Sequence, residues 1–243
     1  MQRYFIFDQQ IEQDLAKIVG KDVHHITHVM RFSVGDQIIV NTYNGDVFLS
    51  EIIEFSKLNV VVRLVKKLPT KSLNFQLDLG LALTKKDAFE YALKKVTELG
   101  VSGIIPLMTE RSMIKVKDFD KKKQRFLTIC KESAEQSERH QIPRIDDISK
   151  IGQIDVSMYK HLFYAYARHD GLGLYQVLKE KSLLEKSLVL IGPEGGFSAS
   201  ELELMDKLGF QRISLGSTIL RAETAAIYVA GAFRLMAGEK DES

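Results

Sequence analysis

The sequence predicts an α/β protein in two parts, a small β-rich domain over residues 1–70 and a parallel sheet flanked by helices over residues 73–243. Two observations lead to this prediction. Runs of β-branched and aromatic residues separated by turn signals fill the first part. In the second part, short apolar runs alternate with helical periodicity, as in βαβ units. The segment Leu68–Lys71, which contains Pro69, interrupts both patterns and is the expected boundary.

The first part is expected to form a small β-barrel. Its strands are predicted where β-branched and aromatic residues concentrate, at 4–7, 37–43, 47–55 and 60–65. The dipeptide Asn44-Gly45 predicts a tight hairpin between the second and third of these strands. A helix is predicted over Ile11–Val19, ahead of a histidine-rich segment.

The second part contains five predicted strands and five predicted helices in alternation. The strands are expected at 75–83, 103–107, 161–166, 187–191 and 211–215, and the helices at 87–98, 119–139, 173–180, 199–208 and 221–236. This order predicts helices on both faces of a parallel sheet. Such sheets bind ligands at the carboxyl ends of their strands, so the loops after the strands are the expected site.

Composition narrows the class of protein. Hydrophobic residues make up 45% and charged residues 27% of the 243, as is ordinary for a globular protein. The net charge of +2 is too small to indicate nucleic-acid binding from the total, so any basic surface must be local. One cysteine, Cys130, excludes an intrachain disulfide and a multi-cysteine metal site. No apolar stretch approaches a membrane span and the N-terminus has no signal-peptide core, so the cytoplasm is the expected compartment.

The segment 187–201, S-L-V-L-I-G-P-E-G-G-F-S-A-S-E, has the strongest signal for a ligand loop. The wholly apolar run Leu188–Ile191 predicts a buried central strand, and glycines then allow a ligand to approach the main chain closely. Ser198 and Glu201 have the spacing of a capping box that opens a helix. The spacing matches neither G-x-G-x-x-G nor a Walker loop, which disfavours a nucleotide phosphate. A tight strand-to-helix turn without a ligand is the alternative.

A second segment, 213–226, repeats the pattern of a strand broken by glycine and followed by a helix. Ile213–Leu215 is a short apolar strand, Gly216 ends it, and Arg221 and Glu223 stand at the start of an alanine-rich helix. Two such strand ends can together form one pocket lined by backbone.

These two segments resemble the signature of the ribosomal RNA small subunit methyltransferase E family, within the SPOUT superfamily. The resemblance rests on L-I-G-P-E-G-G-F-S and L-G-S-T-I-L-R-A-E-T-A-A. It is supported in the expected order by H-H-I-T-H-V-M-R-F-S-V-G-D (24–36), K-V-T-E-L-G-V (95–101), P-L-M-T-E-R-S (106–112) and E-Q-S-E-R (135–139). The resemblance implies a PUA-like RNA-binding barrel followed by a SPOUT-type, trefoil-knotted methyltransferase domain. Periodicity alone indicates no knot.

The resemblance also implies an activity, transfer of a methyl group from S-adenosyl-L-methionine to N3 of one uridine, uracil 1498, of 16S ribosomal RNA. The substrate is expected to be that RNA within the assembled small subunit, and the enzyme is expected to be a homodimer that needs no metal. The residues that match the cofactor-lining motifs of the family are Leu190, Gly192, Gly195, Gly196, Leu215, Gly216, Leu220 and Ala225.

Methylation at N3 requires loss of the N3 proton, so the site must stabilise an anionic base or accept the proton. Arg221 is the first candidate for stabilising this charge, because a guanidinium stays protonated and presents a fixed fork of donors. Glu194 and Glu223 are candidates for the base. Either carboxylate could instead bond to amides at a helix start.

The candidates for RNA contact are basic residues near expected loop or helix ends: Arg3, Arg31, Lys85, Lys86, Arg111 and Arg139. Between Arg111 and Lys131 eight basic residues stand against two acidic ones, which suits a surface that tracks phosphates. A solvated helix face is the alternative, and we favour it for Lys121–Lys123. The family often has a small residue where Glu138 stands, which leaves the contacts beside Arg139 open.

Three histidines, His24, His25 and His28, raise the possibility of a metal site, since positions 24 and 28 share a helical face. No cysteine or carboxylate cluster completes a ligand set, so packing or RNA contact is the favoured interpretation. Two other functions compete with methyl transfer. One is RNA binding without chemistry, which the intact glycines at 192, 195, 196 and 216 argue against. The other is a nucleotide-dependent enzyme for a small molecule, which gives the N-terminal domain no role.

Overall fold

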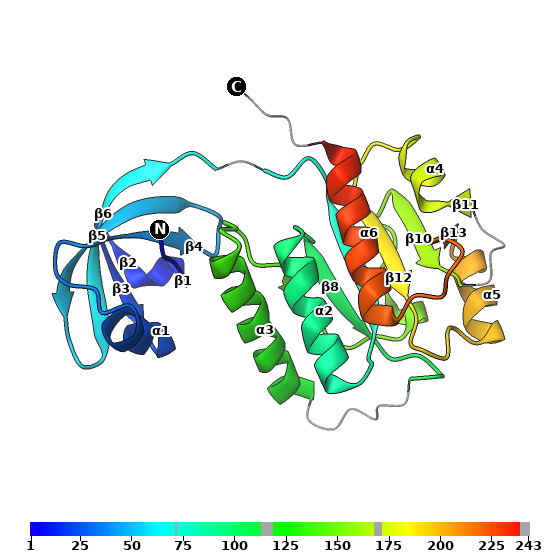
Figure 1. Cartoon of the computed structure of the whole chain (residues 1–243), viewed down its shortest axis with the longest axis horizontal. Coiled ribbons are helices and arrows are strands. Elements are labelled where there is room, and N and C mark those ends of the chain that lie inside the picture. Colours follow the sequence, from blue (N-terminus) through cyan, green and yellow to red (C-terminus); the bar gives the residue numbers. More distant parts are fainter. Residues whose placement is uncertain (71, 113–118, 168–171, 239–243) are drawn as a thin grey trace. The chain divides into compact units, whose positions relative to one another are not determined.

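The computed structural model describes residues 1–70, 72–112, 119–167 and 172–238. The chain divides into two compact units (Figure 1). The first consists of Met1–Ser72 together with Lys131–Ile142, and the second of Leu73–Cys130 together with Pro143–Ser243. The first unit therefore includes a segment from the middle of the chain, which the sequence does not indicate. Lys115, Lys117 and Asp118 of the predicted basic run lie outside the described residues.

The first unit contains a six-stranded sheet in the order β1-β4-β5-β6-β3-β2. The strands are β1 (Arg3–Ile6), β2 (Ile11–Glu12), β3 (Leu15–Val19), β4 (Gln37–Thr42), β5 (Val47–Phe55) and β6 (Asn59–Leu68). Tyr4 on β1 and Ile18 on β3 belong to one buried cluster although their strands lie far apart in the strand order. The sheet therefore curves around a single core, as expected for a small barrel-like domain.

The hairpin between β4 and β5 confirms the Asn44-Gly45 prediction. Gly45 takes a φ of 95° and its N–H donates to the carbonyl oxygen of Thr42 at 3.0 Å. Few residues other than glycine adopt a positive φ without cost. The turn sets the antiparallel pairing of Asn41 with Val47.

The predicted helix over Ile11–Val19 is wrong. Residues 11–12 and 15–19 form β2 and β3, an antiparallel pair joined through Gln13, whose φ is 58°. Along β3 the buried residues Ala16 and Ile18 alternate with exposed Lys17 and Val19, which is the period of a strand. The apolar spacing at 11, 15 and 18 also fits a helix, and pairing of β3 with β6 decides in favour of the strand.

The histidine-rich segment forms α1 (Lys21–His24) and a single-turn π-helix, η2 (His25–Val29). The rings of His24 and His28 stack at a centroid distance of 4.6 Å, and Nδ1 of His25 lies 2.9 Å from the hydroxyl of Tyr4. Among the described residues, no group of three or more histidine, cysteine, aspartate or glutamate side chains is arranged to hold a metal ion.

The second unit contains a seven-stranded, wholly parallel sheet in the order β11-β13-β10-β12-β7-β8-β9. The strands are β7 (Leu77–Ala82), β8 (Gly103–Leu107), β9 (Arg144–Ile145), β10 (His161–Ala165), β11 (Leu172–Gly173), β12 (Ser187–Ile191) and β13 (Gln211–Ser214). The five predicted strands are present and β8 and β12 have the predicted bounds. The sequence did not predict β9 and β11, which have two residues each.

Helices cover both faces of this sheet. They are α2 (Lys86–Glu98), α3 (Phe119–Gln136), of which the part from Lys131 belongs to the first unit, α4 (Leu174–Leu178), α5 (Ala199–Lys207) and α6 (Ala222–Ala237). On one face α6 packs against β7 and β12 and contacts α2 and α4 (Figure 1). On the other face Met205 of α5 joins a buried cluster with Leu188 and Leu190 of β12. Burial on both faces explains why β12 is apolar throughout.

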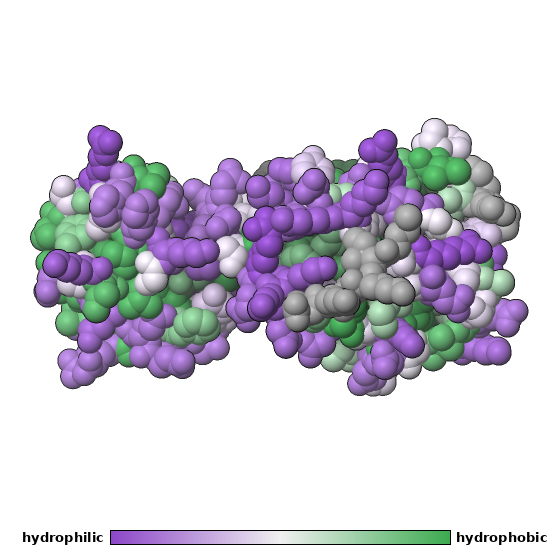
Figure 2. All heavy atoms as spheres, turned by 90° about the horizontal axis from the view of Figure 1, so that it is seen from below, coloured by the Kyte–Doolittle hydropathy of each residue, from purple (hydrophilic) through white to green (hydrophobic). Residues whose placement is uncertain are grey.

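On the face drawn in Figure 2, hydrophilic side chains separate the hydrophobic patches from one another. No helix in the described part of the chain has the length and apolar character needed to cross a membrane.

Candidate functional site

The loop after β12 turns sharply at the carboxyl end of this buried strand. The N–H of Gly196 donates to the carbonyl oxygen of Pro193 at 2.8 Å, and Gly196 takes a φ of 66°. A Cβ at Gly192 would approach the ring of Phe197 to 3.2 Å, so the loop folds tightly over this buried side chain. The capping box follows as predicted, because Ser198 Oγ accepts from the N–H of Glu201 and Glu201 Oε2 accepts from the N–H of Ser198.

The loop after β13 leads into α6. Gly216 takes a φ of 120°, and Arg221 is the N-cap residue of the helix without a capping bond from its side chain. The carbonyl oxygen of Arg221 accepts from the N–H of Ala225 at 2.8 Å. The strand order places β10 between β12 and β13, so the loops after all three strands lie at one edge of the sheet.

These loops enclose a cavity of about 390 Å³, within the range of small-molecule sites. Most of its wall is backbone and apolar side chain. Among the described lining residues, Arg111 and Glu194 are the charged ones. The lining residues are Arg111, Ala165, Tyr166, Ala167, Ile191, Gly192, Pro193, Glu194, Gly195, Gly196, Phe197, Ala199, Leu202, Leu215, Gly216, Thr218, Ile219, Leu220, Ala222 and Ala225.

The turn after β8, T-E-R-S at 109–112, is tied to the glycine loop by hydrogen bonds. Arg111 donates from a terminal guanidinium nitrogen to the carbonyl oxygen of Gly195 at 2.8 Å. Glu201 Oε1 accepts from the N–H of Glu110 at 2.9 Å. Hydrogen bonds from Ser200 and then Ser198 lower the pKa of Glu110 below its ordinary value. The two sequence motifs therefore form one structure at the edge of the sheet.

Tyr166, which follows β10, is the half-buried aromatic residue of the cavity wall. Its ring lies 5.1 Å from the guanidinium carbon of Arg212, a cation–π distance. Arg212 also donates to the hydroxyl of Tyr164 at 2.6 Å, and this hydroxyl donates to Asp206 Oδ1 at 2.8 Å. Burial, followed by the bond to Asp206, raises the pKa of Tyr164, so this phenol stays protonated at neutral pH.

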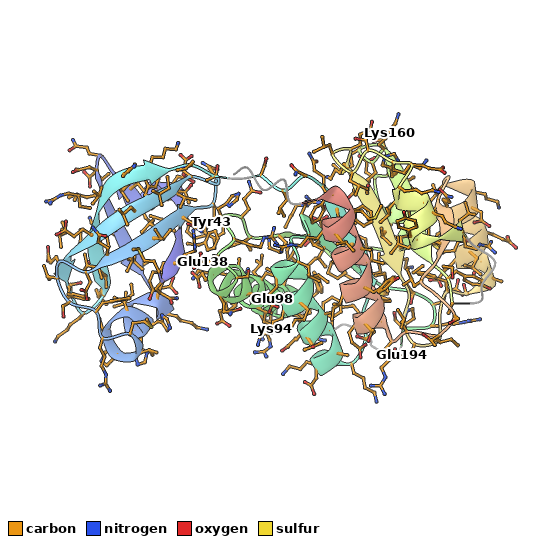
Figure 3. All side chains as sticks on the ribbon, turned by 45° about the horizontal axis from the view of Figure 1, so that its top comes forward. Tyr43, Lys94, Glu98, Glu138, Lys160 and Glu194 are labelled. Carbon is orange, nitrogen blue, oxygen red and sulfur yellow. The ribbon has the colours of Figure 1, made fainter. Side chains whose placement is uncertain are left out.

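Seven of the eight residues predicted to line a cofactor pocket line this cavity: Gly192, Gly195, Gly196, Leu215, Gly216, Leu220 and Ala225. Leu190 instead lies fully buried in the core beneath it. Figure 3 shows Glu194, which is exposed at the cavity, at the end of the second unit opposite Lys160.

Arg221 and Glu223 do not line this cavity. They line a neighbouring hollow of about 740 Å³ on the same unit, together with Asp87, Tyr91 and Leu220. Leu220 borders both spaces, so Arg221 lies one residue from the cavity wall. Glu223 is an acidic residue in the first turn of α6, where a carboxylate also stabilises the helix dipole.

The basic residues predicted to contact RNA occupy different positions. In the second unit, Lys85 and Lys86 are exposed at the start of α2, on the edge of the sheet that carries the cavity. In the first unit, Arg31 is exposed and takes a φ of 55° two residues after the end of the π-helix. A positive φ is uncommon for a residue other than glycine.

Arg3 and Arg139 make contacts within the first unit. Arg3 donates to Glu138 Oε2 at 3.3 Å, and the carbonyl oxygen of Arg139 accepts from Asn41 at 2.9 Å. Glu138 itself takes a φ of 56°, a conformation that a small residue such as glycine adopts more readily.

Sequence reasoning missed Tyr166 and the second bond of Glu201. Tyr166 was predicted as the last residue of the strand 161–166, whereas β10 ends at Ala165, and the adjacency of β10 to β12 and β13 is not specified by local sequence. For Glu201, the capping-box spacing predicted the bond to Ser198 alone. The bond to Glu110 joins residues 91 positions apart.

Comparisons with known proteins agree with this arrangement. A model described as an RNA methyltransferase domain matches residues 71–234, and one described as an RNA methyltransferase PUA domain matches residues 18–65. Ribosomal RNA small subunit methyltransferase E of Bacillus subtilis (strain 168) is 35% identical over 96% of this chain and 95% of its own length. The chain belongs to the ribosomal RNA small subunit methyltransferase E family.

Another member of the family and a solved structure also match most of the chain. The protein of this name from Rickettsia conorii (strain ATCC VR-613 / Malish 7) is 34% identical over 90% of this chain and 89% of its own length. The solved structure of the putative methyltransferase Lpg2936 from Legionella pneumophila, in complex with the cofactor SAM, is 26% identical with a TM-score of 0.85, covering 96% of each chain. The resemblance read from the sequence, and the SPOUT-type α/β fold preceded by a small β domain, are therefore confirmed.

Proposed function

We propose that this chain transfers the methyl group of S-adenosyl-L-methionine to N3 of a uridine in 16S ribosomal RNA. The observation that carries the proposal is the cavity at the carboxyl edge of the parallel sheet, where backbone from two glycine loops forms the wall. Its size and its few charged side chains suit a ligand made largely of adenosine and methionine. Family membership names the substrate class, since its relatives are ribosomal RNA small subunit methyltransferases.

The cofactor fits the residues present. Gly196 and Gly216 have positive φ and line the cavity without side chains, so a ligand can reach their main-chain groups. A protein of the same fold, Lpg2936, binds SAM. When bound, the cofactor supplies an electrophilic methyl group on a sulfonium ion.

The residues of the chain act on the uracil. N3 must lose its proton before its electron pair can take the methyl group, and the negative charge then spreads onto the two carbonyl oxygens that flank N3. Glu194, exposed at the cavity, is the proposed proton acceptor, with Glu223 as the alternative. Arg221 is proposed to stabilise the negative charge from the start of α6, where the helix dipole also favours an anion.

RNA binding is proposed to involve both units. Arg3, Arg31 and Arg139 belong to the first, and Lys85, Lys86 and Arg111 to the second, where Arg111 would contact the target base rather than a backbone phosphate. We further propose a homodimer. Two large hydrophobic side chains, Tyr228 and Leu235, are 50% and 80% exposed on the largely apolar helix α6, which supports a second copy packing there. Size-exclusion chromatography with light scattering tests this part, and a monomer at micromolar concentration would contradict it.

One experiment tests the proposed function. The purified protein is incubated with methyl-labelled S-adenosylmethionine and either small ribosomal subunits that lack the modification or free 16S RNA, and the labelled base is then mapped. We expect one methyl group at N3 of a single uridine, with assembled subunits preferred. Label on another base or on protein, or no transfer to either substrate, would contradict the proposal.

A further inference from the structure

The cavity wall includes a cationic side chain, that of Arg111, whereas Arg221 lines the neighbouring hollow. Arg111 follows β8 and lines the cavity, and its side chain is exposed, so it lies at the mouth of the space. Among the described residues, it is the sole lysine or arginine in the cavity wall. Glu194, the charged group of opposite sign in this wall, makes no ion pair with it among the described residues. A cation and a carboxylate are thus both present at the mouth of the cavity.

Arg111 is held in place from both sides of the turn that carries it. Its guanidinium donates to the carbonyl oxygen of Gly195, in the loop after β12. The preceding residue, Glu110, is fixed through its N–H by Glu201, whose side chain is 8% exposed. Burying a carboxylate is costly unless hydrogen bonds satisfy it, and Glu201 spends both oxygens on main-chain N–H groups, one in each loop.

This arrangement does more than close a loop. A capping box requires only the bond from Glu201 to Ser198, so the bond to Glu110 is additional. Its effect is to fix the main chain directly beside Arg111. A guanidinium has five N–H donors in a rigid fork, and the bond to Gly195 orients the fork while leaving other donors for a ligand.

We infer that Arg111 is a second catalytic residue, which donates hydrogen bonds to a carbonyl oxygen beside N3 of the target uracil, and that Glu201 positions it. The inference rests on the proposed function. Arg111 stays protonated throughout and gives no proton to the base. It stabilises the negative charge that appears on the oxygen as the N3 proton leaves to the carboxylate acceptor. The N3 electron pair then forms the bond to the methyl carbon, whose bond to sulfur breaks with its electrons left on the sulfur as a neutral thioether. The uracil anion has two such oxygens, so Arg221 and Arg111 can both contribute.

The first test compares Arg111→Ala and Arg111→Lys with the parent in single-turnover methyl transfer at saturating cofactor and RNA. Arg111→Ala is expected to lower the rate by about 10²–10³-fold, the scale for loss of one charge-stabilising donor. Arg111→Lys keeps the charge without the fork and is expected to be intermediate. Cofactor and RNA dissociation constants should stay within about threefold of the parent, because the lost hydrogen bond stabilises the transition state and not the ground-state complex. Lys207→Ala, which removes an exposed charge from the far end of α5, is the matched control.

The second test asks whether Glu201 acts through Arg111. Glu201→Gln keeps one acceptor oxygen and replaces the other with a donor, so one of the two loops loses its bond. We expect a rate lower by about tenfold, and a double variant with Arg111→Ala that is no slower than Arg111→Ala alone, since residues that act as a unit are not additive. Glu203→Gln, exposed on the same helix, is the control and should have the parental rate.

The outcomes separate this inference from the proposed function. No methyl transfer by the parent protein would contradict the proposed function itself. With an active parent, an Arg111→Ala rate near the parental value would overturn the catalytic role. Weaker cofactor binding with a normal saturated rate would assign Arg111 to the cofactor, and weaker RNA binding with a normal saturated rate would make it a backbone anchor. Additive effects in the double variant would make Glu201 a structural residue only.

Discussion

The two edges of the parallel sheet in the second unit are built in opposite ways. At the carboxyl edge, glycine loops leave backbone and space, and charged groups such as Glu194 stand exposed. At the amino edge, charged side chains fill the interior. Figure 3 shows the two ends, marked by Glu194 at the cavity and Lys160 just before β10.

Asp78 is the centre of the amino edge. Its side chain is fully buried near the start of β7, and Oδ2 accepts from Arg144 at 2.7 Å and from the hydroxyl of Tyr159 at 2.7 Å, with the Lys186 ammonium 3.3 Å away. Burial and then the bond to Asp78 raise the pKa of Tyr159, so the phenol remains a donor. A Cβ at Gly103 would lie 2.6 Å from Oδ1 of Asp78, so this glycine makes room for the carboxylate.

The contrast indicates that the two edges of the sheet have different roles, with stabilising ion pairs at the amino edge and ligand binding at the carboxyl edge. The partners of Asp78 come from β9 and from segments before β10 and β12, so this edge joins strands without a cavity. The carboxyl edge instead joins β8, β10, β12 and β13 through loops that a ligand can enter. Substitutions at the two edges should therefore change different measurements.

The largest effect is expected for Arg221→Ala, at the carboxyl edge of the sheet, which we call the binding edge because it carries the cavity. If Arg221 stabilises the uracil anion, the single-turnover rate should fall by about 10²–10³-fold. The unfolding temperature and the cofactor dissociation constant should stay near those of the parent, because Arg221 is exposed and makes no capping bond from its side chain. The rate is measured on the purified, folded variant by quenching single-turnover methyl-transfer reactions at a series of times. A near-parental rate together with loss of dimer would make the residue structural.

Asp78→Asn, at the opposite edge, should reverse this pattern. The substitution keeps the volume but removes the charge facing Arg144 and Lys186. We expect a loss of about 3 kcal/mol in the free energy of unfolding, the low end for breaking a buried ion pair, because Arg144 keeps a bond to Asp146. Denaturant unfolding measures it, with Asp146→Asn as a control whose cost should be below about 1 kcal/mol, as for partly exposed pairs. Weakened cofactor binding in the folded Asp78→Asn variant would contradict the claim that the amino edge serves stability and the carboxyl edge serves binding.

Local sequence was enough to predict most elements of the second unit. The apolar run Ser187–Ile191 and the strand Gly103–Leu107 were bounded correctly, because both are short, buried and flanked by turn residues. The prediction of a helix over 11–19 is wrong because the three apolar residues fit both helical and strand periodicity. Only the pairing of β3 with β6 decides in favour of strands. Strands of two residues, such as β9, have too few side chains for any period to appear.

The cavity was predicted in part for a similar reason. The two glycine-broken strand ends are local features, and the sequence predicted that they meet. Tyr166 and Arg111 enter the site through strand order and through hydrogen bonds between distant loops, which local patterns do not specify. Leu190 follows the apolar pattern of its strand but points to the core, where a Cβ at Gly80 would clash with its side chain.

Gly195→Val sharpens the comparison within the binding edge. Gly195 has no positive φ, so backbone strain is not the reason for a glycine here. A Cβ would lie 3.5 Å from Cβ of Arg111, in ordinary contact, and the further methyl groups of valine must then enter the cavity or displace Arg111. We expect cofactor affinity to fall by about 10- to 100-fold, or about 1.4–2.7 kcal/mol. Calorimetry measures it, and Gly195→Ala, whose Cβ fits, should bind nearly as the parent does. Equal affinity for the valine variant would remove this loop from the cofactor site.

The smallest effect is expected for the double variant Arg31→Ala, Lys86→Ala, which has one substitution in each unit. Arg31 is exposed in an unusual backbone conformation after the π-helix, and Lys86 is exposed at the start of α2 on the binding edge. If each neutralises one phosphate, the slope of log K against log salt should become shallower by about 0.7–0.9 for each cation, while affinity at low salt falls only modestly. RNA binding is measured over a salt series with Lys57→Ala, Lys207→Ala as the charge-matched control, since both lysines are exposed elsewhere on the two units. A parental slope in the double variant would place the RNA surface on other residues. A slope that is shallower by the contribution of two cations would show that RNA contacts extend beyond the cavity.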